Sequence, residues 1–131
     1  MEKLKLKYRD CLKEIDTLGE IFKEPFSIIV RDAAIQRFEY TFEAFWKFLR
    51  EYLKEKEGLI VNSPKSCFRE IFSIGLLKEE ETLKCLDMTD RRNETAHTYR
   101  EKVAQVIFNE IKQYYHNLME TIVKRFNEED L

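Results

Sequence analysis

One short segment of the chain, residues 90–100 (DRRNETAHTYR), concentrates side chains that could do chemistry. Histidine can donate or accept a proton near neutral pH, and the guanidinium group of arginine matches phosphate oxygens with parallel N–H donors. This combination suits a phosphodiester or a nucleotide, and a nearby tyrosine hydroxyl could contact the same ligand or be modified. The candidate site residues are Arg92, Asn93, His97 and Tyr99.

The spacing of these residues limits what they can do together. Asn93 and His97 are four residues apart, so they share a face if the helix continues that far, and Asn93 could then orient the ring of His97. Arg92 precedes His97 by five residues, which is about 140° around an ideal helix. Arg92 and His97 therefore converge only if the helix ends between them or if a second copy of the chain supplies one of them.

The segment also has a purely structural interpretation, because arginine, histidine and tyrosine at a helix turn often serve only as caps and ion pairs. Asp87 and Asp90 lie near Arg91 and Glu94, at spacings that suit a solvated charge network. The other histidine, His116, falls inside an expected helix, where we interpret it as structural or exposed.

The elements around the segment are expected to be helices. Thr98 and Glu101 have the S/T-x-x-E spacing of a capping box, which predicts a new helix from residue 99 or 100 to about residue 127. A preceding helix is expected at about 78–96, with glutamates in its first turn. The candidate site then lies at a turn between two helices, where the free amides of the new helix also favour an anion.

Apolar periodicity and turn residues predict three more helices upstream, at about 4–22, 27–56 and 64–74. Pro25 separates the first two, and Ser63 followed by Pro64 is a helix start signal. The second helix is apolar on more than one face, so we expect one face to pack in the bundle and another to meet a second copy. Together these patterns predict a single all-α domain over residues 1–131, an antiparallel up-down bundle of four to five helices that dimerises.

Composition narrows the class of protein. With 131 residues, 44% of them hydrophobic and 37% charged, the chain suits one globular domain, and only 3 Gly and 2 Pro favour long helices. The net charge of -2 argues against nonspecific coating of nucleic acid.

No uncharged run approaches the roughly 20 residues that span a bilayer, and the N-terminus lacks the apolar core of a signal peptide. Cys11, Cys67 and Cys85 show no metal or disulfide spacing. We expect a cytoplasmic protein with reduced thiols, no metal, no cofactor and no membrane partner.

The residues RNETAHTY at 92–99 resemble the HEPN superfamily, which is marked by R-N-x-x-x-H. The H-x-Y extension is similar to the group described as nucleotidyltransferase substrate-binding proteins. The residues RFEYTFEAFWK at 37–47 resemble that group's long second helix, and so does the short helix opened by SPK at 63–65 and followed by GL at 75–76. The likeness spans nearly the whole chain.

The resemblance implies a dimeric helical bundle with the motif near the dimer cleft, encoded beside a minimal nucleotidyltransferase. Some HEPN proteins are metal-independent RNases, often toxins, and the partner transferase acts as antitoxin by transferring AMP to the motif tyrosine. On that pattern Arg92 would hold the scissile phosphate, His97 would act in acid–base catalysis, Asn93 would orient the motif, and Tyr99 would be modified or contact the ligand.

We therefore expect the HEPN partner of a minimal nucleotidyltransferase in a toxin–antitoxin-type module, with a metal-independent RNase site of Arg92 and His97 at the dimer cleft and RNA or a nucleotide as ligand. The alternative is a noncatalytic subunit that binds a nucleotide or substrate for the transferase. A third possibility is a helical dimerisation domain whose motif only stabilises the turn.

Overall fold

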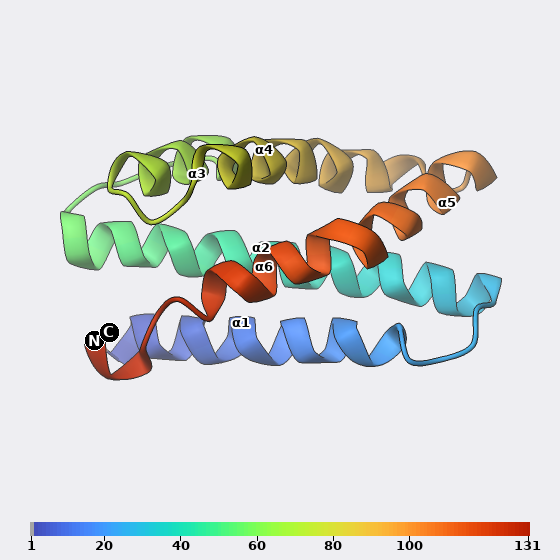
Figure 1. Ribbon diagram of the computed structural model, residues 1–131, viewed down its shortest axis with the longest axis horizontal. Helices are drawn as coiled ribbons and strands as arrows, with labels where there is room; N and C mark the ends of the chain where they lie inside the picture. The colour runs from blue at the N-terminus through green and yellow to red at the C-terminus, as the bar shows by residue number, and fades with distance from the viewer. Residues whose placement is uncertain (1) are drawn as a thin grey trace.

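The computed structural model describes residues 2–131, and every regular element in that range is helical. The chain runs up and down in antiparallel passes, and both termini lie at the same end of the bundle (Figure 1). The elements in order are α1 (Glu2–Ile21), α2 (Ile28–Glu57), α3 (Pro64–Ser73), α4 (Glu79–Glu94), the 3₁₀ turn η1 (Thr95–His97), α5 (Glu101–Glu110), the π-helical segment η2 (Ile111–Tyr115), α6 (His116–Val123) and the 3₁₀ turn η3 (Glu128–Asp130). The predicted all-α antiparallel bundle is confirmed.

Helices α2 and α3 begin and end where local sequence chemistry predicts. Ser27 and Ser63 cap α2 and α3, because each side-chain oxygen accepts a hydrogen bond from the amide three residues later, at 3.0 and 3.3 Å. Pro64 occupies the first turn of α3. Gly58 and Gly75 follow α2 and α3 with φ of 64° and 83°, conformations that a side chain would disfavour.

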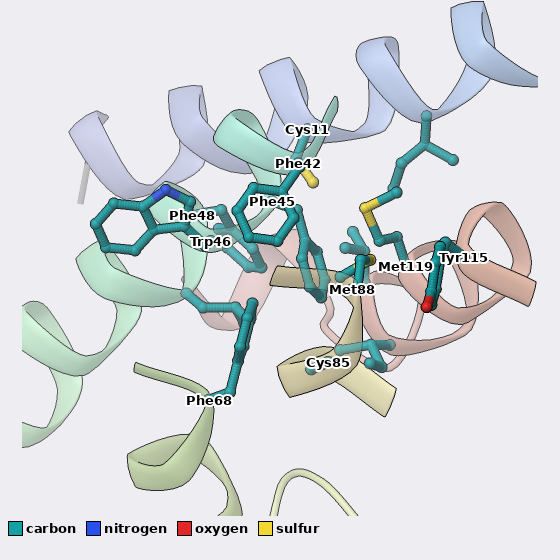
Figure 2. Close-up of a cluster of buried hydrophobic side chains, with 14 of the residues drawn as sticks. Cys11, Phe42, Phe45, Trp46, Phe48, Phe68, Cys85, Met88, Tyr115 and Met119 are labelled. Atoms are coloured by element: carbon teal, nitrogen blue, oxygen red, sulfur yellow. The ribbon is translucent and has the colours of Figure 1, made fainter. Parts of the chain in front are cut away.

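Helix α2 lies in the middle of the bundle, and its aromatic side chains fill the core together with those of the other helices (Figure 2). Its fully buried phenylalanines each contribute about 2 kcal/mol by leaving water. The four apolar residues off its main seam are also buried within the single chain: Ala34, Trp46, Phe48 and Leu53 are at most 7% exposed. These four residues leave no apolar face for a second copy, because α1 covers one side of α2 while α3 and α5 pack against it elsewhere. Contact between another part of α2 and a second copy stays a prediction.

The last antiparallel pass, which consists of α5, η2 and α6, is not the continuous helix to residue 127 that the sequence predicts. It contains the π turn η2, and its regular part ends at Val123. The cause lies in the spacing of the apolar stripe, which takes three consecutive steps of four residues from Val103 to Tyr115. Each such step drifts by about 40° around an α-helix. A wider turn compensates for this drift and keeps Ile111 and Tyr115 buried.

Contacts between α1 and the last pass close the bundle. The His116 ring nitrogen Nε2 lies 3.0 Å from the carbonyl oxygen of Ile15, so the structural interpretation of this histidine is confirmed. The Tyr8 hydroxyl donates to the carbonyl of Phe126, and Arg9 pairs with Glu128.

The three cysteines are unpaired and buried, and burial raises the pKa of each thiol, that of Cys67 to about 12. Within residues 2–131, no helix is both long and apolar enough to cross a membrane.

Candidate functional site

The candidate site lies at the junction between α4 and α5, at the end of the bundle opposite the termini (Figure 1). Helix α4 ends at Glu94, two residues before the predicted end, and η1 then leads to α5. The predicted capping box is wrong. The Thr98 hydroxyl donates instead to the carbonyl of Thr95, 3.0 Å away, and α5 begins after Arg100 without a side-chain cap.

Glu101 does not complete a capping box because its carboxylate is bound elsewhere. The guanidinium of Arg31 on α2 lies 2.5 Å from that carboxylate (Nη1 to Oε2). Arg31 is only 4% exposed, whereas Glu101 is exposed, and the hydrogen bond from Arg31 lowers the pKa of the Glu101 carboxyl. This pair attaches the first turn of α5 to α2. It thereby fixes one side of the junction.

Arg92 lies half-buried in the last turn of α4. Its Nη1 donates to the Thr95 hydroxyl at 3.1 Å and lies 3.4 Å from the Glu39 carboxylate of α2. Its Nε is buried and has no hydrogen-bond partner among residues 2–131. Arg92 lines an open groove of about 480 Å³ with residues of α1 and α2: Asp10, Lys13, Glu14, Glu39, Tyr40, Glu43 and Ala44. We call this the Arg92 groove.

His97 and Tyr99 lie on the exposed side of the same junction. Their rings meet edge to face, with centroids 6.1 Å apart, and Tyr99 is 73% exposed. The Arg100 guanidinium lies 5.6 Å from the centre of the Tyr99 ring. Tyr99 lines a second open groove, of about 570 Å³, with Asp32, Ala33, Ile35, Gln36, Glu39 and Thr98. We call this the Tyr99 groove. Glu39 borders both grooves.

Not all predicted site residues come together within one chain. Asn93 is exposed, and in the described part of the chain its side chain makes no hydrogen bond to His97 or to any other residue. Within a single copy, no hydrogen bond between Asn93 and His97 supports the expectation that Asn93 orients the His97 ring. No hydrogen bond or ring contact joins Arg92 to His97 within residues 2–131, although both occupy one junction.

Sequence reasoning missed Glu39, which pairs with Arg92, and Glu110, which accepts a hydrogen bond from Arg91 at 2.7 Å (Nε to Oε2). Both residues make contacts between elements that are far apart in sequence, so helical periodicity does not predict these contacts. The expected pairing of Asp87 with Arg91 is not found within residues 2–131, because Arg91 pairs with Glu94 and Glu110. Asp90 pairs with Lys65 instead.

Charge around the motif is mixed and mostly negative. The Arg92 groove carries four carboxylates and two cations, and the Tyr99 groove carries two carboxylates. Among residues 2–131, no group of three or more His, Cys, Asp or Glu side chains could hold a metal ion. The chemistry available at the junction is therefore a guanidinium for an anion, an imidazole for proton transfer and an exposed phenol.

The helical order defines an up-down bundle with the motif at the α4–α5 junction. The chain shares this fold with the tri-AMPylated HEPN toxin of Shewanella oneidensis, solved in complex with MNT antitoxin, at a TM-score of 0.67 and 18% identity over 93% of this chain and 92% of that one. The chain belongs to the family described as nucleotidyltransferase substrate binding protein like, whose model matches residues 6–128. The predicted family is confirmed.

A second solved structure is more similar in sequence. It is the crystal structure of a Thermus thermophilus protein, with 50% identity and a TM-score of 0.82, covering 88% of this chain and 97% of that chain. Among curated proteins, no sequence matches the chain. The family and the fold are therefore established by these likenesses, and the activity of this chain is a separate question.

Proposed function

We propose that this protein is the HEPN partner of a minimal nucleotidyltransferase and a metal-independent RNase whose activity that transferase restrains. The observation that carries the proposal is the placement of Arg92, His97 and Tyr99 at one junction, with the His97 ring against an exposed Tyr99. A Shewanella HEPN toxin with this fold is AMP-modified and bound by an MNT antitoxin. We extend that arrangement to this chain.

In the proposed reaction, the ribose 2′-hydroxyl attacks the adjacent phosphorus and the bond to the 5′-oxygen breaks. The products are a 2′,3′-cyclic phosphate and a 5′-hydroxyl. Arg92 holds the phosphate oxygens, and His97 moves the proton taken from the 2′-hydroxyl or given to the leaving oxygen. Because Arg92 and His97 do not touch within one chain, we place the complete site between two copies, each contributing to the cleft. Transfer of AMP from ATP to the Tyr99 hydroxyl, with loss of the hydroxyl proton and release of pyrophosphate, would add negative charge beside His97 and repel RNA.

The test is incubation of the purified protein with total RNA and tRNA in EDTA, beside Arg92→Ala and His97→Ala. We expect cleavage by the native protein and a loss of at least about a hundredfold in each variant, the usual contribution of a general acid–base for His97 and of a charge-stabilising group for Arg92. Cleavage that survives in both variants comes from a contaminant and counts against the proposal. Sedimentation at micromolar concentration tests the dimer, and a monomer there contradicts the shared cleft.

One observation favours the alternative, a noncatalytic subunit that binds a nucleotide or substrate for the transferase. The Arg92 groove carries more carboxylates than cations, and such a surface suits a protein partner better than a polyanion. If the folded, unmodified protein does not cleave RNA but co-purifies with the transferase encoded nearby, the alternative holds. Three buried, unpaired cysteines suit a reducing compartment, so we place the protein in the cytoplasm.

A further inference from the structure

The π turn η2 brings together two residues that an α-helix would separate. Residues five apart lie about 140° apart around an α-helix. In η2 the amide of His116 bonds to the carbonyl of Ile111, five residues earlier, so the turn is wider. As a result Glu110 and Tyr115 lie on the same side, and the Tyr115 hydroxyl donates to Glu110 Oε2 at 3.1 Å. The π turn therefore makes this hydrogen bond possible.

The same carboxylate oxygen binds the end of α4. Arg91 Nε donates to Glu110 Oε2 at 2.7 Å, and Arg91 Nη1 reaches Glu94 at 2.8 Å. Burial and the neighbouring Glu110 raise the pKa of Tyr115, and the hydrogen bond to Glu110 raises the pKa of Arg91. The phenol of Tyr115 therefore stays neutral and the guanidinium of Arg91 stays charged throughout the physiological range.

Arg91 and Arg92 attach the last turn of α4 to two different elements. Arg91 attaches it to the π turn through Glu110, while Arg92 pairs with Glu39 on α2. The two attachments are coupled, because the Tyr115 ring stacks on Phe38, the residue preceding Glu39, with centroids 6.1 Å apart and planes at 24°. Tyr115 is only 4% exposed and lies within the core (Figure 2). A shift of Tyr115 would therefore be transmitted to both sides of this turn.

We propose that Glu110 and Tyr115 are positioning residues for the motif arginine. Through Arg91 they hold the last turn of α4 and fix the direction in which Arg92 meets a ligand phosphate. The inference rests on the proposed function for the ligand, but its structural part, the fixing of this turn, can be measured without any ligand. A turn held on one side only would leave Arg92 with several orientations, and catalysis depends on the orientation of the binding groups.

The decisive variant is Tyr115→Phe, which removes one hydroxyl and keeps the ring on Phe38. Tyr114→Phe is the matched control, because Tyr114 is 50% exposed and its hydroxyl makes no hydrogen bond within residues 2–131. Glu110→Gln is the second test, since it removes the charge that binds Arg91. Each protein is assayed for amide hydrogen exchange, for thermal stability, and for kcat and KM of RNA cleavage in EDTA.

In Tyr115→Phe and Glu110→Gln we expect faster exchange confined to residues 92–98 and a kcat lowered about tenfold with KM changed less, as for the loss of one hydrogen bond to a charged group. Tyr114→Phe should match the native protein. Exchange that rises evenly across the bundle, or kcat equal to that of the native protein, overturns the inference. If the native protein itself cleaves no RNA, the proposed function fails and exchange alone decides. Protection at 92–98 that is lost in Tyr115→Phe and Glu110→Gln but kept in Tyr114→Phe supports the inference, and unchanged protection in Tyr115→Phe overturns it.

Discussion

Arg92, the arginine of the motif, lies with its Nη1 3.4 Å from the Glu39 carboxylate of α2. An anionic ligand must compete with this carboxylate for the same guanidinium group. Arg92 keeps a second donor, Nε, without a partner among residues 2–131. The arginine is thus held in place by one group while part of its hydrogen-bonding capacity stays unused. Glu39 also borders both grooves of the junction, so its charge acts on any ligand that enters either of them.

Removing the charge of Glu39 should strengthen the binding of a phosphate-containing ligand. Glu39→Gln keeps the size of the side chain, and a partly exposed ion pair of this kind is worth up to about 1 kcal/mol, so we expect about threefold tighter binding. The measurement is fluorescence anisotropy with a 2′-deoxy oligonucleotide, which cannot be cleaved. Glu43→Gln is the control, because Glu43 lines the same groove but pairs with Trp46 and Lys47. Equal tightening in both variants would show a general charge effect and not release of Arg92.

Tyr99 should be the residue that accepts AMP from a nucleotidyltransferase. It is 73% exposed beside His97, so its hydroxyl is open to a second protein. Intact-mass spectra after co-expression with the neighbouring transferase should show added AMP on the native protein and none on Tyr99→Phe. Tyr114→Phe removes another exposed tyrosine, and it should be modified as the native protein is. Undiminished modification of Tyr99→Phe would place the accepting group elsewhere.

The fold was predictable from the sequence because its signals are local. Serine caps, Pro64 and the glycines after α2 and α3 mark helix ends in the sequence, and each acts within a few residues. The π turn was predictable only in part. Three consecutive steps of four residues in the apolar stripe signal a drift, but an α-helix can also absorb such a drift by bending. The sequence pattern alone does not distinguish these outcomes, because both keep the apolar stripe on one side.

The sequence predicts where the candidate site residues lie along the chain, but not their geometry. Residue types and spacing identified Arg92, His97 and Tyr99, and the structure places all three at one junction. The capping box was wrong because Arg31, 70 residues earlier, binds Glu101. Local spacing favours a capping box, but a buried arginine needs a carboxylate partner. That requirement outweighs the local preference for the cap. The roles of long-range partners such as Glu39 follow only from the packing of α2 against α4.

Acid should weaken the attachment of α4 to the end of the last pass. Arg125 donates to both carboxylate oxygens of Glu81, and this hydrogen bonding lowers the pKa of Glu81 below its ordinary value of 4.5. A carboxyl whose pKa is lowered on folding stabilises the fold at pH values above its pKa in the unfolded chain. That contribution is lost as the pH falls below 4.5 and through the pKa of the folded state. We expect Glu81→Gln to cost about 2 kcal/mol at pH 7 and much less at pH 3.

Urea unfolding of the native protein and Glu81→Gln at pH 7, 4.5 and 3 measures this effect. Glu79→Gln is the control in the same first turn of α4, because Glu79 forms no ion pair within the described residues. Its free energy of unfolding should follow that of the native protein at each pH. A gap between native and Glu81→Gln that stays constant from pH 7 to pH 3 would contradict the assignment to this ion pair.

Gly19 and His116 should show strong coupling in stability. A Cβ atom at Gly19 would lie 3.0 Å from Nε2 and 3.2 Å from Cε1 of His116, while that same Nε2 bonds to the carbonyl of Ile15. In an open helix position, replacing glycine by alanine gains about 1 kcal/mol. In the native protein the alanine must displace the His116 ring and weaken its hydrogen bond, which costs about as much.

The measurement is a double-mutant cycle in urea with Gly19→Ala, His116→Ala and the double variant. Gly19→Ala should leave the free energy of unfolding unchanged or lower in the native background, and raise it by about 1 kcal/mol in the His116→Ala background, where the clash is gone. The coupling energy should therefore be at least about 1 kcal/mol, well above the value for independent sites. Additive effects of the two substitutions would mean that α1 and α6 adjust their separation at little cost, and that the His116 ring does not set how closely these helices pack.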